Sequence, residues 1–169
     1  MVRNAERHAD NPEFQRDMLL TVSHSVDRMK QLMLQLREGT TPVDGSCGVD
    51  LDTVARRVQK SKSPQLPTVE LVVHDAVVAR GHEERIERVI GHLVQNALDA
   101  TPPEGRVWIS IGREGGMASV EVGDTGRGMT EEFMRERLFK PFQTTKQAGM
   151  GIGAYESRQY VQELGGDIR

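Results

Sequence analysis

The segment GDTGRGM, residues 123–129, places one carboxylate among three glycines at the end of an apolar segment. Ala118, Val120 and Val122 alternate before it, so the two-residue period of a strand puts Asp124 on the same, core-facing side. An ionised carboxylate on that side is costly unless a donor binds it. We therefore expect either the protein or a ligand to donate a hydrogen bond to Asp124. A turn-capping role for this residue is the alternative.

Three polar residues recur at helical spacing further upstream. His92, Asn96 and Asp99 lie at i, i+4 and i+7, and so share one face of an expected helix opposite its apolar stripe. An amide oxygen is a suitable ligand for a hard cation such as Mg²⁺, whereas a neutral imidazole is a poor one. Solvation of an outer helix face produces the same pattern, so this row alone does not establish a site.

A glycine-rich run, GMGIG at residues 149–153, is the third chemical signal. Backbone N–H groups that lead into a helix N-terminus form an anion site. Lys146 adds a point charge suited to a terminal phosphate. The run formally matches the dinucleotide pattern G-x-G-x-x-[GA], but FQTTKQA in front of it is not the strand that a Rossmann site needs, so we reject that reading. A plain glycine-rich loop is the alternative.

The elements that must position these residues follow from periodicity and from chain breakers. We expect helices at about 14–36, 51–61, 83–100, 131–137 and 152–164, and strands at 68–73, 76–80, 106–111 and 117–122. GGDIR, residues 165–169, is read as the start of one more strand, and TTPVDGSCG, residues 40–48, as a linker. The helix at 83–100 should bury Ile86, Val89, Ile90, Leu93, Ala97 and Leu98.

Composition bounds the function. A chain of 169 residues can form one domain with a helical appendage. Its 22 basic and 25 acidic residues give no long-range field for nucleic acid or an anionic membrane, and four Phe, two Tyr and one Trp argue against base-stacking platforms. A single cysteine, with no signal peptide and no apolar run of membrane-spanning length, predicts a cytoplasmic setting.

Taken in order along the chain, HLVQNALDAT, DTGRGM, LFKPFQTTK and GMGIGAYESRQYVQELGGDI resemble the N, G1, F and G2 boxes of sensor histidine kinase catalytic domains, within the GHKL ATPase superfamily. The resemblance covers roughly residues 45–169. It implies an α+β fold, a two-layer α/β sandwich of the Bergerat type with a mixed, mostly antiparallel sheet, preceded by a long amphipathic helix. The segment NAERHADNPEFQRDML is similar to PrsK-type kinases of exosortase (PEP-CTERM) systems.

The resemblance also implies roles for single residues. Asp124 would receive the exocyclic amino group of adenine, Asn96 would hold Mg²⁺, and Lys146 would meet the terminal phosphate. His92 departs from the pattern, since the family usually has Asn there in histidine kinases and Glu in ATPase clamps. We expect Asn96, His92 and Lys146 to be catalytic. The wider ATP-binding set is Asn96, Asp99, Asp124, Gly126, Gly128, Met129, Phe139, Thr144, Thr145, Lys146, Gly149, Met150, Gly151, Ile152 and Gly153.

The implied activity is transfer of the γ-phosphoryl group of ATP, with Mg²⁺, to a histidine and onward to a response regulator receiver domain. Residues 1–40 resemble the second helix of a dimerisation hairpin, which implies a homodimer, and residues 41–169 the catalytic domain without its last strands. The phosphoacceptor should lie upstream of Met1, because His24 is followed by Ser25 rather than an acidic residue. The parent protein would be anchored in the bacterial inner membrane through other regions. An ATPase clamp and a non-catalytic dimerisation or nucleotide-sensing module are the alternatives.

Overall fold

The computed structural model describes residues 47–143 and 151–169. The chain divides into two units, Met1–Pro42 and Val43–Arg169, and every described element belongs to the second. The expected helix at 14–36 lies outside the described residues, as do five expected site residues: Thr144, Thr145, Lys146, Gly149 and Met150. The assignment of residues 1–40 to a dimerisation hairpin therefore stays a prediction.

Five strands and four helices make up the described part of the chain. In order they are β1 (Cys47–Asp50), α3 (Leu51–Lys62), β2 (Val69–Val73), β3 (Val78–Gly81), α4 (Glu83–Ala100), β4 (Val107–Glu114), β5 (Met117–Asp124), α5 (Glu131–Glu136) and α6 (Gly153–Glu163). Among the described residues, no helix is both long and apolar enough to cross a lipid bilayer.

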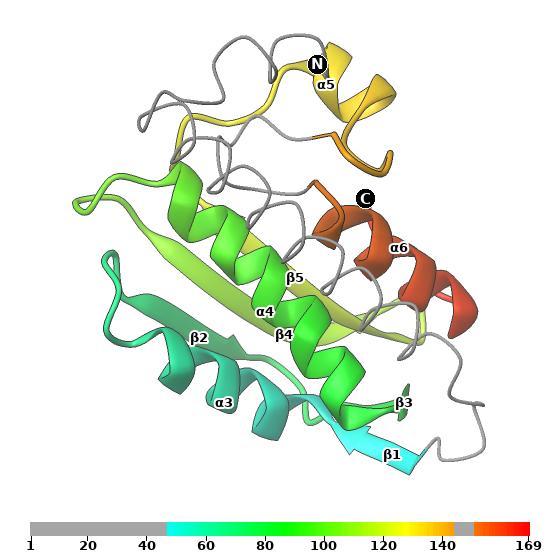
Figure 1. Ribbon diagram of the computed structural model, residues 1–169. Coiled ribbons are helices and arrows are strands. Elements are labelled where there is room, and N and C mark those ends of the chain that lie inside the picture. Colours follow the sequence, from blue (N-terminus) through cyan, green and yellow to red (C-terminus); the bar gives the residue numbers. More distant parts are fainter. Residues whose placement is uncertain (1–46, 144–150) are drawn as a thin grey trace, which may run out of the picture. The chain divides into compact units, whose positions relative to one another are not determined.

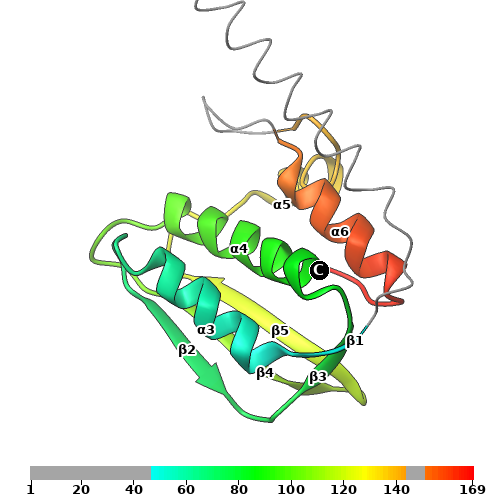
Figure 2. The ribbon, with the colours of Figure 1, turned by 60° about the horizontal axis from the view of Figure 1, so that its bottom comes forward.

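The strands form two sheets. A three-stranded sheet has the order β2-β4-β5, in which β2 runs parallel and β5 antiparallel to β4. A two-stranded antiparallel sheet joins β1 to β3. Helices α3 and α4 cover one face of the larger sheet, and α6 packs along the flank of α4 (Figures 1 and 2). The expected two-layer α+β fold with a mixed, mostly antiparallel sheet is confirmed.

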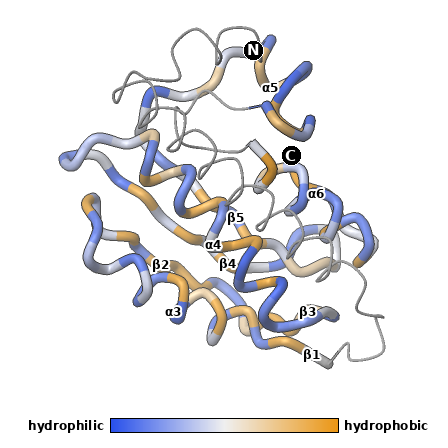
Figure 3. The backbone as a smooth tube through the Cα atoms, in the orientation of Figure 1, coloured by the Kyte–Doolittle hydropathy of each residue, from blue (hydrophilic) through white to orange (hydrophobic). Residues whose placement is uncertain are grey.

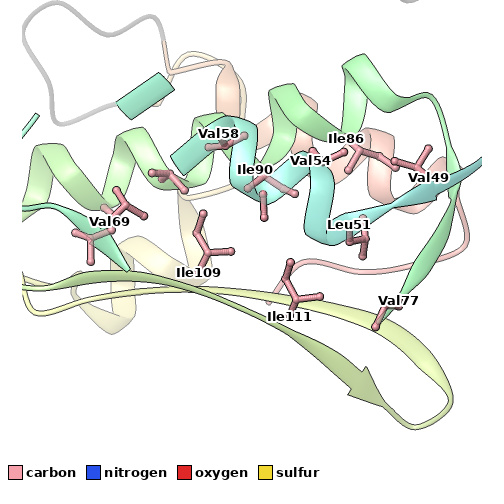
Figure 4. Packing of buried hydrophobic residues seen from close by; sticks show 14 of the residues in the cluster. Val49, Leu51, Val54, Val58, Val69, Val77, Ile86, Ile90, Ile109 and Ile111 are labelled. Atoms are coloured by element: carbon pink, nitrogen blue, oxygen red, sulfur yellow. The ribbon is translucent and has the colours of Figure 1, made fainter. Parts of the chain in front are cut away.

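The core lies between α3, α4 and the larger sheet (Figure 4). Ile109 and Ile111 of β4 are fully buried and meet side chains from both helices, among them Val54 and Val58 of α3 and Ile90 of α4. Figure 3 shows the corresponding hydropathy, with hydrophobic residues along the sheet-facing side of α4 and hydrophilic ones opposite. Full burial of side chains of this size stabilises the fold by about 1.5–3 kcal/mol each.

Helix α4 matches the expected range 83–100. It begins after an extended residue, His82, and it ends shortly before two consecutive prolines, which cannot continue a helix. The buried face differs in detail, since Val94 is fully buried and Leu93 only partly buried, whereas Val89 is partly buried and packs against the core as expected. The apolar stripe is therefore rotated slightly from the predicted one.

Three strand expectations need correction. Residues 47 and 48, read as linker, belong to β1, whose register pairs Cys47 with Gly81. The strand expected at 76–80 is shifted, because β3 starts only at Val78. GGDIR forms no strand within this described part of the chain. Short strands owe their existence to a distant partner, so a local pattern defines them poorly.

Replacement of Gly91 by alanine is expected to stabilise the protein. Gly91 lies inside α4, and a Cβ built on it has no atom within 4 Å. Alanine removes backbone freedom from the unfolded chain at no steric cost, so the free energy of unfolding should rise by about 0.5–1 kcal/mol. Urea unfolding followed by circular dichroism measures it. A decrease in that free energy would contradict the open environment of this position.

Candidate functional site

The polar row expected on α4 lies on its outer side. Asn96 and Asp99 are exposed and His92 is half-buried. Asp99 is held in place, because the side-chain amide of Gln95 donates to its Oδ1 over 2.7 Å. Lys62 of α3 donates in turn to Gln95 Oε1 over 2.8 Å. The end of α3 and the row on α4 are therefore joined by one hydrogen-bond chain.

The turn after β5 is fastened to the carboxyl end of α4. The N–H of Arg127 donates to the carbonyl of Ala100 over 3.2 Å, and the N–H of Thr125 donates to Arg106 O over 3.0 Å. A Cβ on Gly126 would lie 2.3 Å from Ala100 O, so only glycine lets the turn approach the helix this closely. Asp124 is thus held beside the last turn of α4.

The expectation for Asp124 is right about its face of the sheet and wrong about its burial. The register pairs it with Val107, and opposed residues of an antiparallel pair share a face, so the expected core-facing side is right. The side chain is nevertheless exposed, because Asp124 is the last residue of β5, and β5 lies at the end of the strand order formed by the described residues. The carboxylate therefore does not bear the expected free-energy cost of burial.

The protein does supply one donor to this carboxylate. The N–H of Gly126 donates to Asp124 Oδ1 over 2.8 Å, which is the turn-capping role that the sequence left as the alternative. This role does not compete with ligand recognition. An ionised carboxylate has two oxygens and about four acceptor positions, and one backbone donor uses one of them.

The amino end of α6 touches α4 one turn before Asn96. A Cβ on Gly153 would lie 3.3 Å from Nδ1 of His92, so the imidazole rests on the first residue of α6. Gly151 has a φ of +66°, in the left-handed region that glycine adopts without strain. The sequence did not predict the contact of His92 with Gly153, since the two residues are far apart in the chain.

Helix α4 therefore borders both other parts of the site. Its residue 92 contacts the amino end of α6, its residue 100 contacts the turn that holds Asp124, and Asn96 lies midway. At 1.5 Å per residue the two contacts are about 12 Å apart along the helix axis. Three motifs that are distant in the sequence are brought together along one helix.

The remaining described site residues lie around this arrangement. Met129 is 55 % exposed, Gly128 has a φ of +67°, and Ile152 is buried at the start of α6. Phe139 is partly buried, with the guanidinium of Arg158 4.6 Å from its ring centre. Apolar surface next to fixed polar groups is the usual lining of a small-molecule site.

The residues present fit a magnesium ion whose other ligands are substrate phosphates and water. Among residues 47–143 and 151–169, no three His, Cys, Asp or Glu side chains are grouped as a metal cage. Asn96 offers a single amide oxygen on an exposed helix flank. Mg²⁺ usually keeps several waters and takes few protein ligands in addition to substrate phosphates, and one asparagine suits that role.

The pKa of His92 is lowered from its usual 6.5, first by burial and then by the charges of Arg88 and Lys62. Between pH 6.5 and the lowered pKa of His92, the folded state therefore binds fewer protons than the unfolded state. The contribution of the neutral imidazole to the free energy of unfolding is fully present above pH 6.5. It is lost as the pH falls from 6.5 toward the lowered pKa. The ring is neutral at physiological pH, which suits its packing against Gly153.

The variant His92→Asn should consequently make the stability less sensitive to acid. We expect the free energy of unfolding of the unmodified chain to fall more steeply below pH 6.5 than that of the variant, because only the histidine must become charged in a partly buried place. Urea titrations at several pH values between 5 and 8 measure both slopes. Parallel slopes would contradict the burial of the imidazole.

Comparisons with known proteins identify the family to which this part of the chain is similar. Residues 81–169 match the family described as histidine kinase-, DNA gyrase B- and HSP90-like ATPase. The C4-dicarboxylate transport sensor protein DctB of Rhizobium meliloti is 35 % identical over 96 residues, which are 56 % of this chain and 15 % of DctB. Sensor protein DivL of Caulobacter vibrioides is 36 % identical over 108 residues, 62 % of this chain and 14 % of DivL.

Solved structures give the same result for the fold. The nucleotide-free catalytic domain of histidine kinase ThkA superposes with a TM-score of 0.62 at 25 % identity, covering 70 % of this chain and 81 % of that one. Histidine kinase ThkA in complex with response regulator protein TrrA has a TM-score of 0.62 at 21 % identity, covering 98 % and 49 %. The chain spans about one seventh of the length of the two sensor proteins above.

Proposed function

Because the chain belongs to the family of histidine kinase-, DNA gyrase B- and HSP90-like ATPases, we propose that its parent protein is a sensor histidine kinase that uses Mg-ATP. The chain corresponds to the ATP-binding catalytic domain of such kinases. The observation that carries the proposal is the arrangement along α4, where the turn with Asp124, the exposed Asn96 and the amino end of α6 lie together. Phosphoryl transfer needs chiefly such positioning and neutralisation of charge.

Adenine is proposed to bind beside Asp124. The carboxylate is exposed, and its orientation is fixed by the N–H of Gly126. An ionised carboxylate only accepts hydrogen bonds, so it favours a ligand that presents a donor such as the exocyclic amino group of adenine. A hydrogen bond to an ionised partner is about twice as strong as one between neutral groups. The apolar side chain of Met129 and the close approach at Gly126 suit a flat aromatic ring.

The phosphates are proposed to bind between Asn96 and the amino end of α6. Helix α6 begins at Gly153, and its cap residue Ile152 makes no side-chain hydrogen bond to the first turn. Backbone N–H groups at such a helix start favour an anion. Mg²⁺, when bound, would neutralise negative charge on the phosphates, and Asn96 would hold it. Lys146, together with Thr144 and Thr145, is proposed for the terminal phosphate from the family resemblance alone.

The partners are proposals as well. Histidine kinase ThkA, whose structure is similar to this chain, was solved in complex with a response regulator protein, and a receiver domain is the partner that we propose for the parent protein. Homodimerisation through residues 1–40 and anchoring in the bacterial inner membrane are proposed from the resemblance. The similarity to PrsK-type kinases remains a prediction.

Two assays in sequence test the function. Calorimetric titration of Mg-ATP into the chain should give saturable binding. Labelled ATP with a supplied histidine-bearing helical hairpin should then yield phosphohistidine. Binding without transfer would favour a nucleotide-sensing module, hydrolysis without transfer an ATPase clamp, and absence of binding would overturn the proposal.

Asn96→Ala is expected to weaken ATP binding only when magnesium is present. Loss of one metal ligand and its hydrogen bonds should cost about 1–2 kcal/mol, or roughly a five- to thirtyfold weaker affinity in Mg²⁺. In EDTA the affinity of the variant should stay close to that of the unmodified chain. Titrations in both buffers measure the difference, and an equal loss in both would show that Asn96 does not act through the metal.

A further inference from the structure

We infer that Arg158 is a positioning residue, which holds the amino end of α6 in place by stacking on Phe139. This inference rests on the proposed function, which places the phosphates of ATP at the amino end of α6. Arg158 lies on the second turn of α6, and Phe139 lies between α5 and the last residues described before α6. The pair therefore joins two segments that are separate in the described part of the chain.

The contact is a stack rather than a set of hydrogen bonds. The guanidinium carbon of Arg158 lies 4.6 Å from the centre of the Phe139 ring. Its Nε is buried and has no hydrogen-bond partner among the described residues, and its ion pair with Asp167 is long, at 3.8 Å. A guanidinium is weakly hydrated and tolerates an aromatic face in place of water. The ring of Phe139 is thus its principal partner.

A second contact joins the same two segments closer to the site. A Cβ on Gly151 would lie 2.5 Å from the carbonyl oxygen of Gln143 and 2.7 Å from its backbone nitrogen. The chain on both sides of residues 144–150 therefore runs backbone against backbone at this point. The stack of Arg158 on Phe139 is a further contact between these two segments, and His92 contacts Gly153 at the start of α6.

A stack of this kind has a modest but measurable effect. Cation–π pairs at partly exposed sites correspond to about a two- to tenfold change in an equilibrium constant. Because the stack fixes the amino end of α6 and not the turn of Asp124, its loss should weaken the binding of phosphates and leave the recognition of adenine unchanged. The ratio of ATP to adenosine affinity separates these two effects.

The experiment titrates the full chain with Mg-ATP and with adenosine, using the variants Arg158→Gln, Arg158→Lys and Phe139→Leu. Arg56→Gln is the matched control, because it also removes an arginine from an exposed ion pair with an aspartate, but on α3. We expect Arg158→Gln and Phe139→Leu to weaken ATP by about two- to tenfold, with adenosine unchanged, and the double variant to add nothing. Arg158→Lys should recover part of the loss.

Four results would overturn the inference. The first is an ATP affinity of Arg158→Gln within the error of Arg56→Gln, and the second is an equal loss for adenosine. The third is full additivity with Phe139→Leu. If Arg158→Gln fails to fold, Arg158→Lys and Phe139→Leu decide, and the fourth result is an unchanged ATP affinity in both. Failure of the unmodified chain to bind ATP would instead contradict the proposed function, so the two failures are distinguishable.

Discussion

Asp124→Asn is expected to weaken Mg-ATP binding by about one to two decades. The substitution removes the charge of the proposed adenine acceptor and presents an amide in its place. A hydrogen bond to a charged group contributes about 1.5–3 kcal/mol, and each 1.4 kcal/mol corresponds to a factor of ten in affinity. Calorimetry on the variant and on the unmodified chain measures the change.

The fold should survive this change, because the asparagine side-chain oxygen can accept the same hydrogen bond from Gly126 that Asp124 accepts now. Glu121→Gln is the matched control. It removes one negative charge from an exposed position of the same strand, on the opposite face of the sheet. If Asp124→Asn binds ATP as well as Glu121→Gln does, adenine is not recognised by this carboxylate.

The elements predicted best are those whose signals are local. Helix α4 has a complete apolar period, an acidic first turn and two prolines after its end. The hairpin of β4 and β5 has alternating residues on both sides of the pair Gly115–Gly116, which take the positive φ values of a tight turn. In both cases a few neighbouring residues decide the structure.

The elements predicted poorly depend on residues that are distant in the chain. Strand β1 has only four residues, and pairing with β3 more than 25 residues later is what makes it a strand. The exposure of Asp124 depends on the place of β5 in the strand order, which alternation along one strand does not encode.

The same distinction applies to the site. The types of residue and their order along the chain led to Asp124, Asn96 and Gly153, because each belongs to a local motif. The contact of His92 with Gly153, and that of Phe139 with Arg158, cross between elements and have no local signal. Motifs identify the groups that are proposed to bind, whereas the packing that orients these groups is visible only in the fold.

Gly126→Ala provides the sharpest test of that packing, and we expect it to weaken both ATP and adenosine by more than about tenfold. The new Cβ would lie 2.3 Å from the carbonyl oxygen of Ala100 and 2.6 Å from its carbonyl carbon. Both are backbone atoms of a helix end and cannot rotate away, so the turn must move. A displacement of about 1 Å at a reacting site can cost a hundredfold in rate, and binding through Asp124 should suffer similarly.

The loss of adenosine binding separates this effect from the one expected at Arg158, where only the phosphates should be affected. Overpacking should also lower the free energy of unfolding by about 1–3 kcal/mol, so binding is measured at a temperature where circular dichroism shows a folded chain. Gly91→Ala adds the same methyl group to the middle of α4, where nothing lies within 4 Å, and should change neither affinity. If Gly126→Ala binds both ligands normally, the close approach of the turn to α4 is not what orients Asp124, and adenine must be recognised through another part of the site.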